Sequence, residues 1–151
     1  GAEPLVDGRG ITVDGLPDGF YLAPTILDRV DASMSICRDE IFGPVLSVMR
    51  FEDLNTAIDI ANQQAFGNGA CIYTTSGKAA REFSHRIQCG MVGVNVGVPA
   101  PLAYFPFSGW GYSFFGDLHL QGKEAIYFFT RQKVVTSRWF QPGEGDVWHK
   151  D

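Results

Sequence analysis

The chain has 151 residues and a formal net charge of −5, with 45% hydrophobic and 19% charged residues. This length suits one domain or part of a larger one, and the low charge argues against intrinsic disorder. The acidic balance argues against a nucleic-acid partner, and no apolar run is long enough to cross a bilayer. Three cysteines, Cys37, Cys71 and Cys89, fit neither a disulfide framework nor a metal site, and they predict a reducing, cytoplasmic compartment.

The first fifty residues predict turns followed by two strands. Residues 1–19 are rich in glycine, aspartate and proline, which is typical of turns and short extended pieces. Residues 21–30 have strand character, and Pro24 within them favours an edge position or a bulge. Residues 33–40 predict a short helical turn or loop. Residues 44–51 are apolar on both faces, which predicts a buried strand of an α/β sheet.

Two helices are predicted in the middle of the chain. Asp53 or Asn55 can cap the first and Ser76 the second, and Gly90 is placed to end the second. Each helix has one apolar face, formed by Leu54, Ala57, Ile58 and Ala61 in the first and by Ala79, Ala80, Phe83 and Ile87 in the second. Strands are predicted at residues 44–51, 70–74 and 91–96. This alternation predicts an α/β fold, a parallel sheet with crossover helices.

The composition changes after residue 96. Half of the aromatic residues lie within residues 104–129, so this segment must pack against another surface. We therefore expect self-association through residues 97–139. Residues 122–130 predict a helix and residues 133–139 a strand, and the polar tail that follows is expected to fray.

The densest signal for chemistry is the run Glu40-Ile41-Phe42-Gly43-Pro44, directly before a predicted strand. Alternate residues of an extended segment point the same way, so Glu40 and Phe42 would face one side. A carboxylate can accept hydrogen bonds from two sugar hydroxyls, and an aromatic ring can support a second flat ring. The same run is also compatible with an ordinary acidic turn before a strand.

This run resembles the glutamate–phenylalanine motif of the aldehyde dehydrogenase superfamily. Later segments resemble the same family in the same order; they are Gly67-Asn68-Gly69, Gly90 to Asn95, Pro106-Phe107-Ser108-Gly109 and Phe129 to Trp139. Within the family the chain is most similar to the CoA-acylating methylmalonate-semialdehyde dehydrogenases, on Phe115-Gly116-Asp117 and Thr136-Ser137-Arg138-Trp139. One departure is the absence of the family's usual basic residue near Gly111 or Tyr112.

The resemblance implies an NAD-dependent oxidation of a small aldehyde, of the malonate or methylmalonate semialdehyde type, to an acyl-CoA or an acid. CoA or water would be the acyl acceptor. In that scheme Glu40 binds the nicotinamide ribose, Phe42 packs beside the nicotinamide, and Phe107 lines the aldehyde tunnel. The family's nucleophilic cysteine and dinucleotide-binding domain have no counterpart in this sequence. No catalytic residue and no metal ligand is therefore assigned, and the isolated chain is expected to be inactive.

The resemblance also implies a division of the chain. Residues 1–130 would form the C-terminal part of a catalytic domain, residues 131–140 an oligomerisation strand, and residues 141–151 a flexible tail. The strand from Val134 to Trp139 would extend the sheet of another subunit by backbone pairing, which makes a homo-oligomer. The alternative is a stand-alone, non-catalytic module that binds or assembles.

Overall fold

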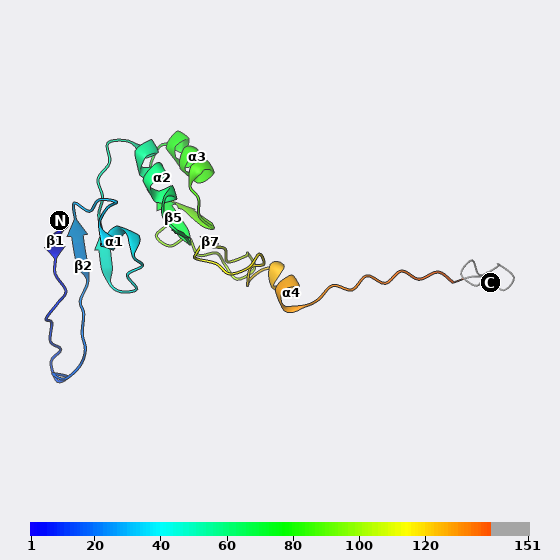
Figure 1. The fold of residues 1–151 in the computed structure, drawn as a ribbon, viewed down its shortest axis with the longest axis horizontal. Helices are drawn as coiled ribbons and strands as arrows, with labels where there is room; N and C mark the ends of the chain where they lie inside the picture. Colours follow the sequence, from blue (N-terminus) through cyan, green and yellow to red (C-terminus); the bar gives the residue numbers. More distant parts are fainter. Residues whose placement is uncertain (140–151) are drawn as a thin grey trace.

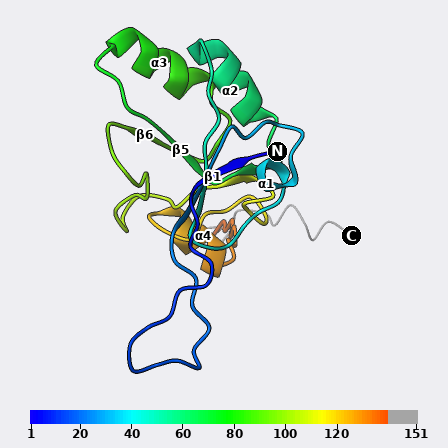
Figure 2. The ribbon, with the colours of Figure 1, turned by 90° about the vertical axis from the view of Figure 1, so that its left-hand side faces the viewer.

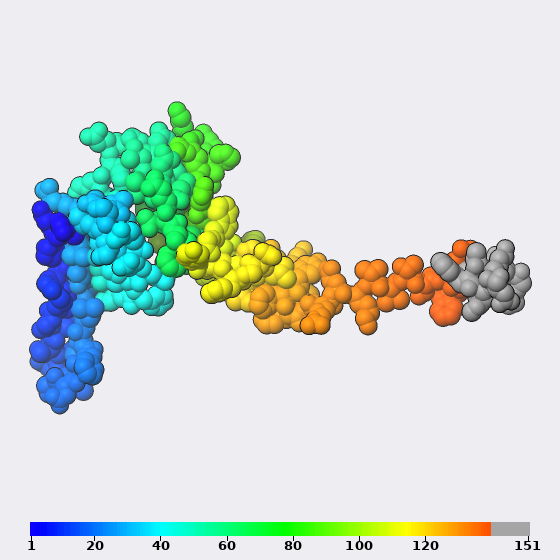
Figure 3. All heavy atoms as spheres, viewed as in Figure 1, coloured from blue at the N-terminus to red at the C-terminus, as the bar shows by residue number. Residues whose placement is uncertain are grey.

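The structure, a computed structural model, describes residues 1–139. Three small sheets and a pair of helices form its body, and residues 112–139, which follow β7 at Trp110–Gly111, project from that body as a narrow arm (Figures 1 and 3). The helix pair lies at one end, and the long connection from β1 to β2 extends the opposite way (Figure 2). No helix among these residues is long and apolar enough to cross a membrane.

The first sheet has the strand order β1-β2-β3, with β1 at Glu3–Val6, β2 at Thr25–Asp28 and β3 at Val45–Ser47. β1 pairs antiparallel with β2, and β2 pairs parallel with β3. The prediction of an edge position for the second segment was wrong, because β2 is central. Pro24 is compatible with this position since it lies just before the strand begins, where its missing N–H interrupts no ladder.

A short helix, α1 at Ser35–Arg38, connects β2 to β3, as predicted for a helical turn in this region. β3 is partly or fully exposed along its length, so the prediction of a buried strand was wrong. The reason is position: β3 is an edge strand, and its only partner among the described residues is β2. The buried Asp28 ends β2 and accepts a 2.6 Å hydrogen bond from Arg50, which follows β3.

The second unit consists of α2 at Leu54–Asn62, β5 at Gly69–Ile72, α3 at Gly77–Arg86 and β6 at Met91–Val94. β5 and β6 are parallel, with α3 as their crossover, which confirms the α/β prediction. Ile58, at 1% exposure, is the centre of a core formed with Phe83, Ile87 and Cys89. The predicted single sheet over residues 44–96 is not formed, because β3 pairs with β2 and not with β5.

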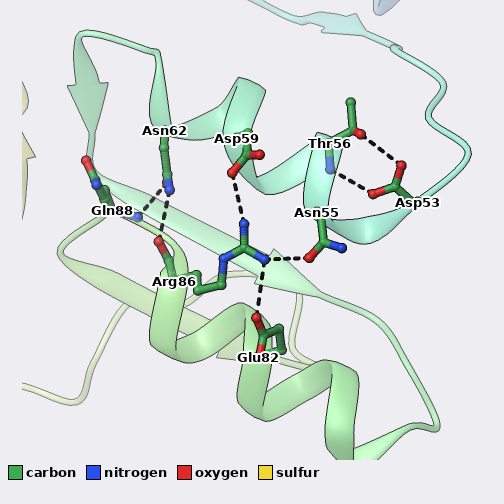
Figure 4. A network of polar contacts seen from close by, with 8 residues as sticks. All are labelled: Asp53, Asn55, Thr56, Asp59, Asn62, Glu82, Arg86 and Gln88. Atoms are coloured by element: carbon green, nitrogen blue, oxygen red, sulfur yellow. Dashed lines mark hydrogen bonds and ion pairs between the residues drawn. The ribbon is translucent and has the colours of Figure 1, made fainter.

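The helix ends are satisfied by specific side chains. The Asp53 carboxylate caps α2 by accepting from the Thr56 N–H, at 2.9 Å, and the Ser76 hydroxyl caps α3 by accepting from the Ala79 N–H, at 3.2 Å. Gly90 does not end α3, contrary to prediction. The helix stops at Arg86, where the Asn62 amide donates to the Arg86 carbonyl, at 2.9 Å, and accepts from the Gln88 N–H, at 2.8 Å (Figure 4).

The two helices are also joined by charge. The Arg86 guanidinium donates to Asp59 of α2 at 2.9 Å and to Glu82 of its own helix at 3.2 Å, and it also donates to Asn55 (Figure 4). Asn55, the alternative cap for α2 in the sequence, is thus used to contact α3. The network fixes how α2 lies on α3 above β5 and β6.

The two helix caps predict different responses to acid. The Thr56 N–H and hydroxyl donate to Asp53 and hold the pKa of its carboxyl below the ordinary value. Such a group stabilises the fold above its unfolded pKa, and this stability is lost as pH falls through the folded-state pKa. Between neutral pH and about pH 2, the thermal midpoint of D53S is therefore expected to fall less than that of the parent chain.

The reverse exchange is the control. Ser76 carries no charge, so S76D is expected to steepen the same acid profile by giving α3 a titratable cap. Parallel profiles for D53S and the parent chain would contradict the assignment.

The C-terminal part of the described chain has little regular structure. β4 at Phe66–Gly67 pairs antiparallel with β7 at Trp110–Gly111, and α4 at Glu124–Phe129 confirms the helix predicted there, with shorter bounds. Residues 131–139 are not assigned to any strand, so the strand predicted at 133–139 is not formed within this chain. A strand requires a partner for its backbone groups, and none of the described residues supplies one. The predicted tail, 141–151, lies outside the described residues.

Candidate functional site

The run from Glu40 to Pro44 forms two consecutive three-residue turns. The Gly43 N–H donates to the Ile41 carbonyl at 2.9 Å, and the Val45 N–H donates to the Gly43 carbonyl at 2.8 Å. These are γ-turns centred on Phe42 and Pro44, and the fixed φ of proline suits the second. The expectation of a plainly extended segment was therefore wrong, since the backbone bends at Gly43 and Pro44.

Ile41 anchors this turn to the first sheet. It lines a hollow of about 460 Å³ together with apolar side chains that include Leu27, Ile36 and Val45. The charged groups at the hollow, Asp7 and Arg9, are paired with each other at 2.7 Å. A lining that is apolar, with its charges already paired, suits packing of side chains. It does not suit the capture of a charged ligand.

The residues on either side of Ile41 are accessible to solvent. Phe42 is 98% exposed and Glu40 is also exposed. Within residues 1–139 no hydrogen bond or ion pair occupies the Glu40 carboxylate, so its oxygens can accept from an external donor. An anchored turn thus presents one free carboxylate and one bare ring, two residues apart. The carboxylate can accept hydrogen bonds from a sugar diol, and the ring can pack against a flat heterocycle next to that sugar.

Phe107 lies on a second segment, the irregular loop between β6 and β7, and is 36% exposed. Two glycines let this loop approach other backbone closely. A Cβ atom on Gly90 would lie 2.4 Å from the Ser108 carbonyl carbon, and one on Gly122 would lie 2.8 Å from the Tyr104 carbonyl oxygen. Only glycine allows both contacts, because no side chain intervenes.

Ser108 of this loop belongs to a hydrogen-bonded chain that sequence analysis missed, together with His119, which follows β7, and Glu124, the first residue of α4. The Ser108 hydroxyl lies 3.0 Å from His119 Nε2, and His119 Nδ1 contacts the Glu124 carboxylate. The hydrogen bonds from His119 hold the pKa of Glu124 below its ordinary value. The three residues are spread over seventeen positions without a regular spacing, so no local pattern indicated that they meet. The one available signal was that Ser108 lies in the loop motif.

Gly111, near which the resemblance would place a basic residue, has a backbone conformation that only glycine adopts readily. Gly111 has φ of +58°, and a Cβ atom there would lie 2.4 Å from the Ala65 carbonyl oxygen. With this backbone, no lysine or arginine fits at position 111. Tyr112 next to it is exposed.

The cysteines do not form a reactive centre within the described residues. Cys89 is buried in the core, and burial raises the pKa of its thiol, which disfavours the nucleophilic thiolate. Cys37 and Cys71 are half-buried. No group of three histidine, cysteine or acidic side chains within residues 1–139 is placed to hold a metal ion.

The candidate segments remain separate in the described chain. The segment around α1 (cyan) and the part of the loop before β7 that contains Phe107 (yellow) lie apart, with the second unit between them (Figure 1). The structure therefore does not join Glu40 and Phe42 with Phe107. Many aromatic side chains of the C-terminal part are exposed, among them Tyr104, Phe105, Tyr112, Phe115 and Phe129. The packing partner expected for them does not lie within residues 1–139.

Comparison with known proteins identifies relatives for nearly the whole chain. A family model described as the aldehyde dehydrogenase family matches residues 1–135. A malonate-semialdehyde dehydrogenase of Halalkalibacterium halodurans is 52% identical over 139 residues, covering 92% of this chain and 28% of the relative. Two crystal structures described as methylmalonate-semialdehyde dehydrogenases have TM-scores of 0.89. The one from Sinorhizobium meliloti, complexed with NAD, is 47% identical, and the one from Oceanimonas doudoroffii 46%. The chain spans 28–29% of the length of these three proteins.

Proposed function

The chain belongs to the aldehyde dehydrogenase family, and from this premise we propose that it forms the C-terminal part of the catalytic region of an NAD-dependent semialdehyde dehydrogenase. The substrate class is malonate or methylmalonate semialdehyde, which is supported by the names of the relatives. Because the chain spans 28–29% of those proteins, we propose the activity for the complete enzyme. The isolated chain is proposed to be inactive.

The free carboxylate and bare ring at Glu40 and Phe42 are the observation that carries the proposal. When bound, NAD supplies an acceptor for the hydride that leaves the aldehyde carbon. Glu40 would accept hydrogen bonds from the two hydroxyls of the nicotinamide ribose, and Phe42 would pack beside the nicotinamide. The γ-turn anchored by Ile41 holds both residues on one short segment, which limits how far the bound ring can move.

The exposed arm supports assembly of the proposed enzyme. Val134, Val135 and Trp139 are exposed, and residues 131–139 pair with no strand within the described part of the chain. We propose that the strand from Val134 to Trp139 forms by pairing with the sheet of another subunit, which would satisfy its backbone groups and cover its apolar side chains. We propose CoA or water as the acyl acceptor, on the resemblance to the CoA-acylating branch of the family.

The alternative of a stand-alone assembly module is supported by the same exposed surface. It differs from the enzyme in one respect: an assembly module has no use for Glu40 and Phe42. The experiment below separates the two.

We expect E40Q in the complete enzyme to raise the KM for NAD by about tenfold to a hundredfold, because a hydrogen bond to a charged acceptor is replaced by a weaker one. F42A is expected to raise it as well. Steady-state kinetics at saturating aldehyde provide the measurement.

E52Q is the matched control, since Glu52 is also exposed but lies after β3, away from the turn. An unchanged KM for NAD in both E40Q and F42A would refute the proposed cofactor contacts. If the 151-residue chain is an assembly module, E40Q is expected to leave its binding to its partner unchanged, and a clear loss of affinity would count against that alternative.

A further inference from the structure

Ser108, His119 and Glu124 form one continuous hydrogen-bonded chain. Besides its side-chain contact, Glu124 accepts a 3.2 Å hydrogen bond from the backbone N–H of His119. The imidazole is also flanked by Phe114, with ring centroids 4.9 Å apart. His119 is therefore held from three directions, by a carboxylate, a hydroxyl and a ring.

The carboxylate determines the direction of the hydrogen bonds. An ionised carboxylate can only accept, so Nδ1 of His119 carries a proton and donates to Glu124. In the neutral ring Nε2 then has a lone pair, and it accepts from the Ser108 hydroxyl. In either charge state of the ring, the Ser108 hydroxyl is held by its 3.0 Å hydrogen bond with His119 Nε2.

Backbone contacts fix both neighbours of Phe107 in the same loop. A Cβ atom on Gly122 would lie 3.2 Å from the Pro106 nitrogen, and one on Gly90 would lie 2.5 Å from the Gly109 nitrogen. The Gly122 N–H also donates to the Ala103 carbonyl at 3.2 Å. Backbone approach therefore holds the loop before and after Phe107, while His119 holds the side chain next to it.

We propose that His119 and Glu124 are positioning residues that fix the Ser108 hydroxyl and, through it, the place of the Phe107 ring in the wall of the aldehyde tunnel. This inference rests on the proposed function, because it takes Phe107 as a tunnel residue. Its consequence is selectivity: the pair determines which aldehydes fit best, while the chemical step belongs to other residues.

Three variants of the complete enzyme separate the contacts. S108A removes only the hydroxyl. H119N keeps an amide nitrogen near the place of Nδ1, within reach of Glu124, but cannot reach Ser108. H119Q extends an amide to the place of Nε2 and can restore the contact with Ser108.

The readout is the ratio of kcat/KM for propanal to kcat/KM for hexanal. A variant that merely lowers the amount of folded enzyme lowers both values equally and leaves the ratio unchanged. We expect S108A and H119N each to move this ratio by about threefold to tenfold, with H119Q closer to the parent enzyme. The double variant S108A/H119N should be no worse than either single variant, since both remove the same hydrogen bond.

F107A decides what a negative result means. A changed ratio in F107A with an unchanged ratio in S108A and H119N overturns the positioning role and leaves the tunnel assignment standing. An unchanged ratio in F107A overturns the tunnel assignment of Phe107 and this inference with it, while the NAD contacts tested through Glu40 stand on their own. S108A removes a single oxygen atom, so it decides the question even where a histidine variant folds poorly.

Discussion

Replacing Ile58 with alanine is expected to lower the free energy of unfolding by about 2–5 kcal/mol, the range for a buried isoleucine truncated to alanine. Ile58 is the most buried large side chain in the described part of the chain, at 1% exposure. It lies between α2 and α3 and contacts the core formed by Phe83, Ile87 and Cys89. The core is small, so few neighbours can move to fill the space that truncation leaves.

Urea titration of the 151-residue chain, followed by far-UV circular dichroism, measures this loss. I58V removes one methylene group and is the matched control, with an expected loss of about 0.5–1.5 kcal/mol. Equal midpoints for I58A and the parent chain would mean that this core does not hold the second unit together.

The second large effect is expected at Gly90. G90A would place a Cβ atom 2.5 Å from both the Ser108 carbonyl oxygen and the Gly109 nitrogen. Backbone atoms cannot rotate away as the end of a side chain can, so the loop that carries Phe107 must shift. Overpacking of this kind costs about 1–3 kcal/mol, and with two backbone clashes we expect a loss of about 3 kcal/mol.

G90A is measured by the same urea titration and by limited chymotrypsin digestion. A displaced loop should be cleaved faster after Phe107, which mass spectrometry identifies. G77A is the control, because a Cβ atom at Gly77 meets nothing closer than Arg81 Nη1 at 3.4 Å, and alanine favours the helix. If G90A and G77A unfold at the same urea concentration, the close approach of Gly90 to Ser108 does not affect the free energy of unfolding.

The second unit was predictable because its signals are local. Caps at Asp53 and Ser76 and apolar faces centred on Ile58 and Phe83 act within one or two helical turns. The structure places helices at both segments, with parallel β5 and β6 beside them. The prediction that Gly90 ends α3 was wrong, because the Asn62 side chain already donates to the carbonyl of Arg86, the last residue of α3.

The sheet to which each strand belongs was not predictable from the sequence, because it depends on which other strand has an unpaired edge next to it. β3 pairs with β2, although sequence order favoured a sheet with β5 and β6. The strand expected at residues 133–139 has the correct composition but no partner within the described residues. The amino-acid composition of a segment determines its tendency to adopt an extended backbone. A β-strand forms only when a second strand has an unpaired edge with which it can pair.

The candidate site was likewise predictable from the sequence only in part. Glu40, Phe42 and Phe107 could be named from motifs, and their roles stay predictions. The contacts of His119 with Ser108 and Glu124 could not be predicted from the sequence, because they depend on the approach of Gly122 to the loop at Tyr104. That approach is a property of the folded backbone.

The double hydrogen bond of Asn62 ties the stability of one helix to that of the other. Asn62 is the last residue of α2, and its side chain binds the Arg86 carbonyl and the Gln88 N–H at the end of α3. The C-terminal turn of α3 therefore cannot fray without losing a partner that α2 provides, and unwinding of α2 exposes the end of α3. We therefore expect the two helices to open and close as a single cooperative unit, so that their amide hydrogens exchange with solvent together.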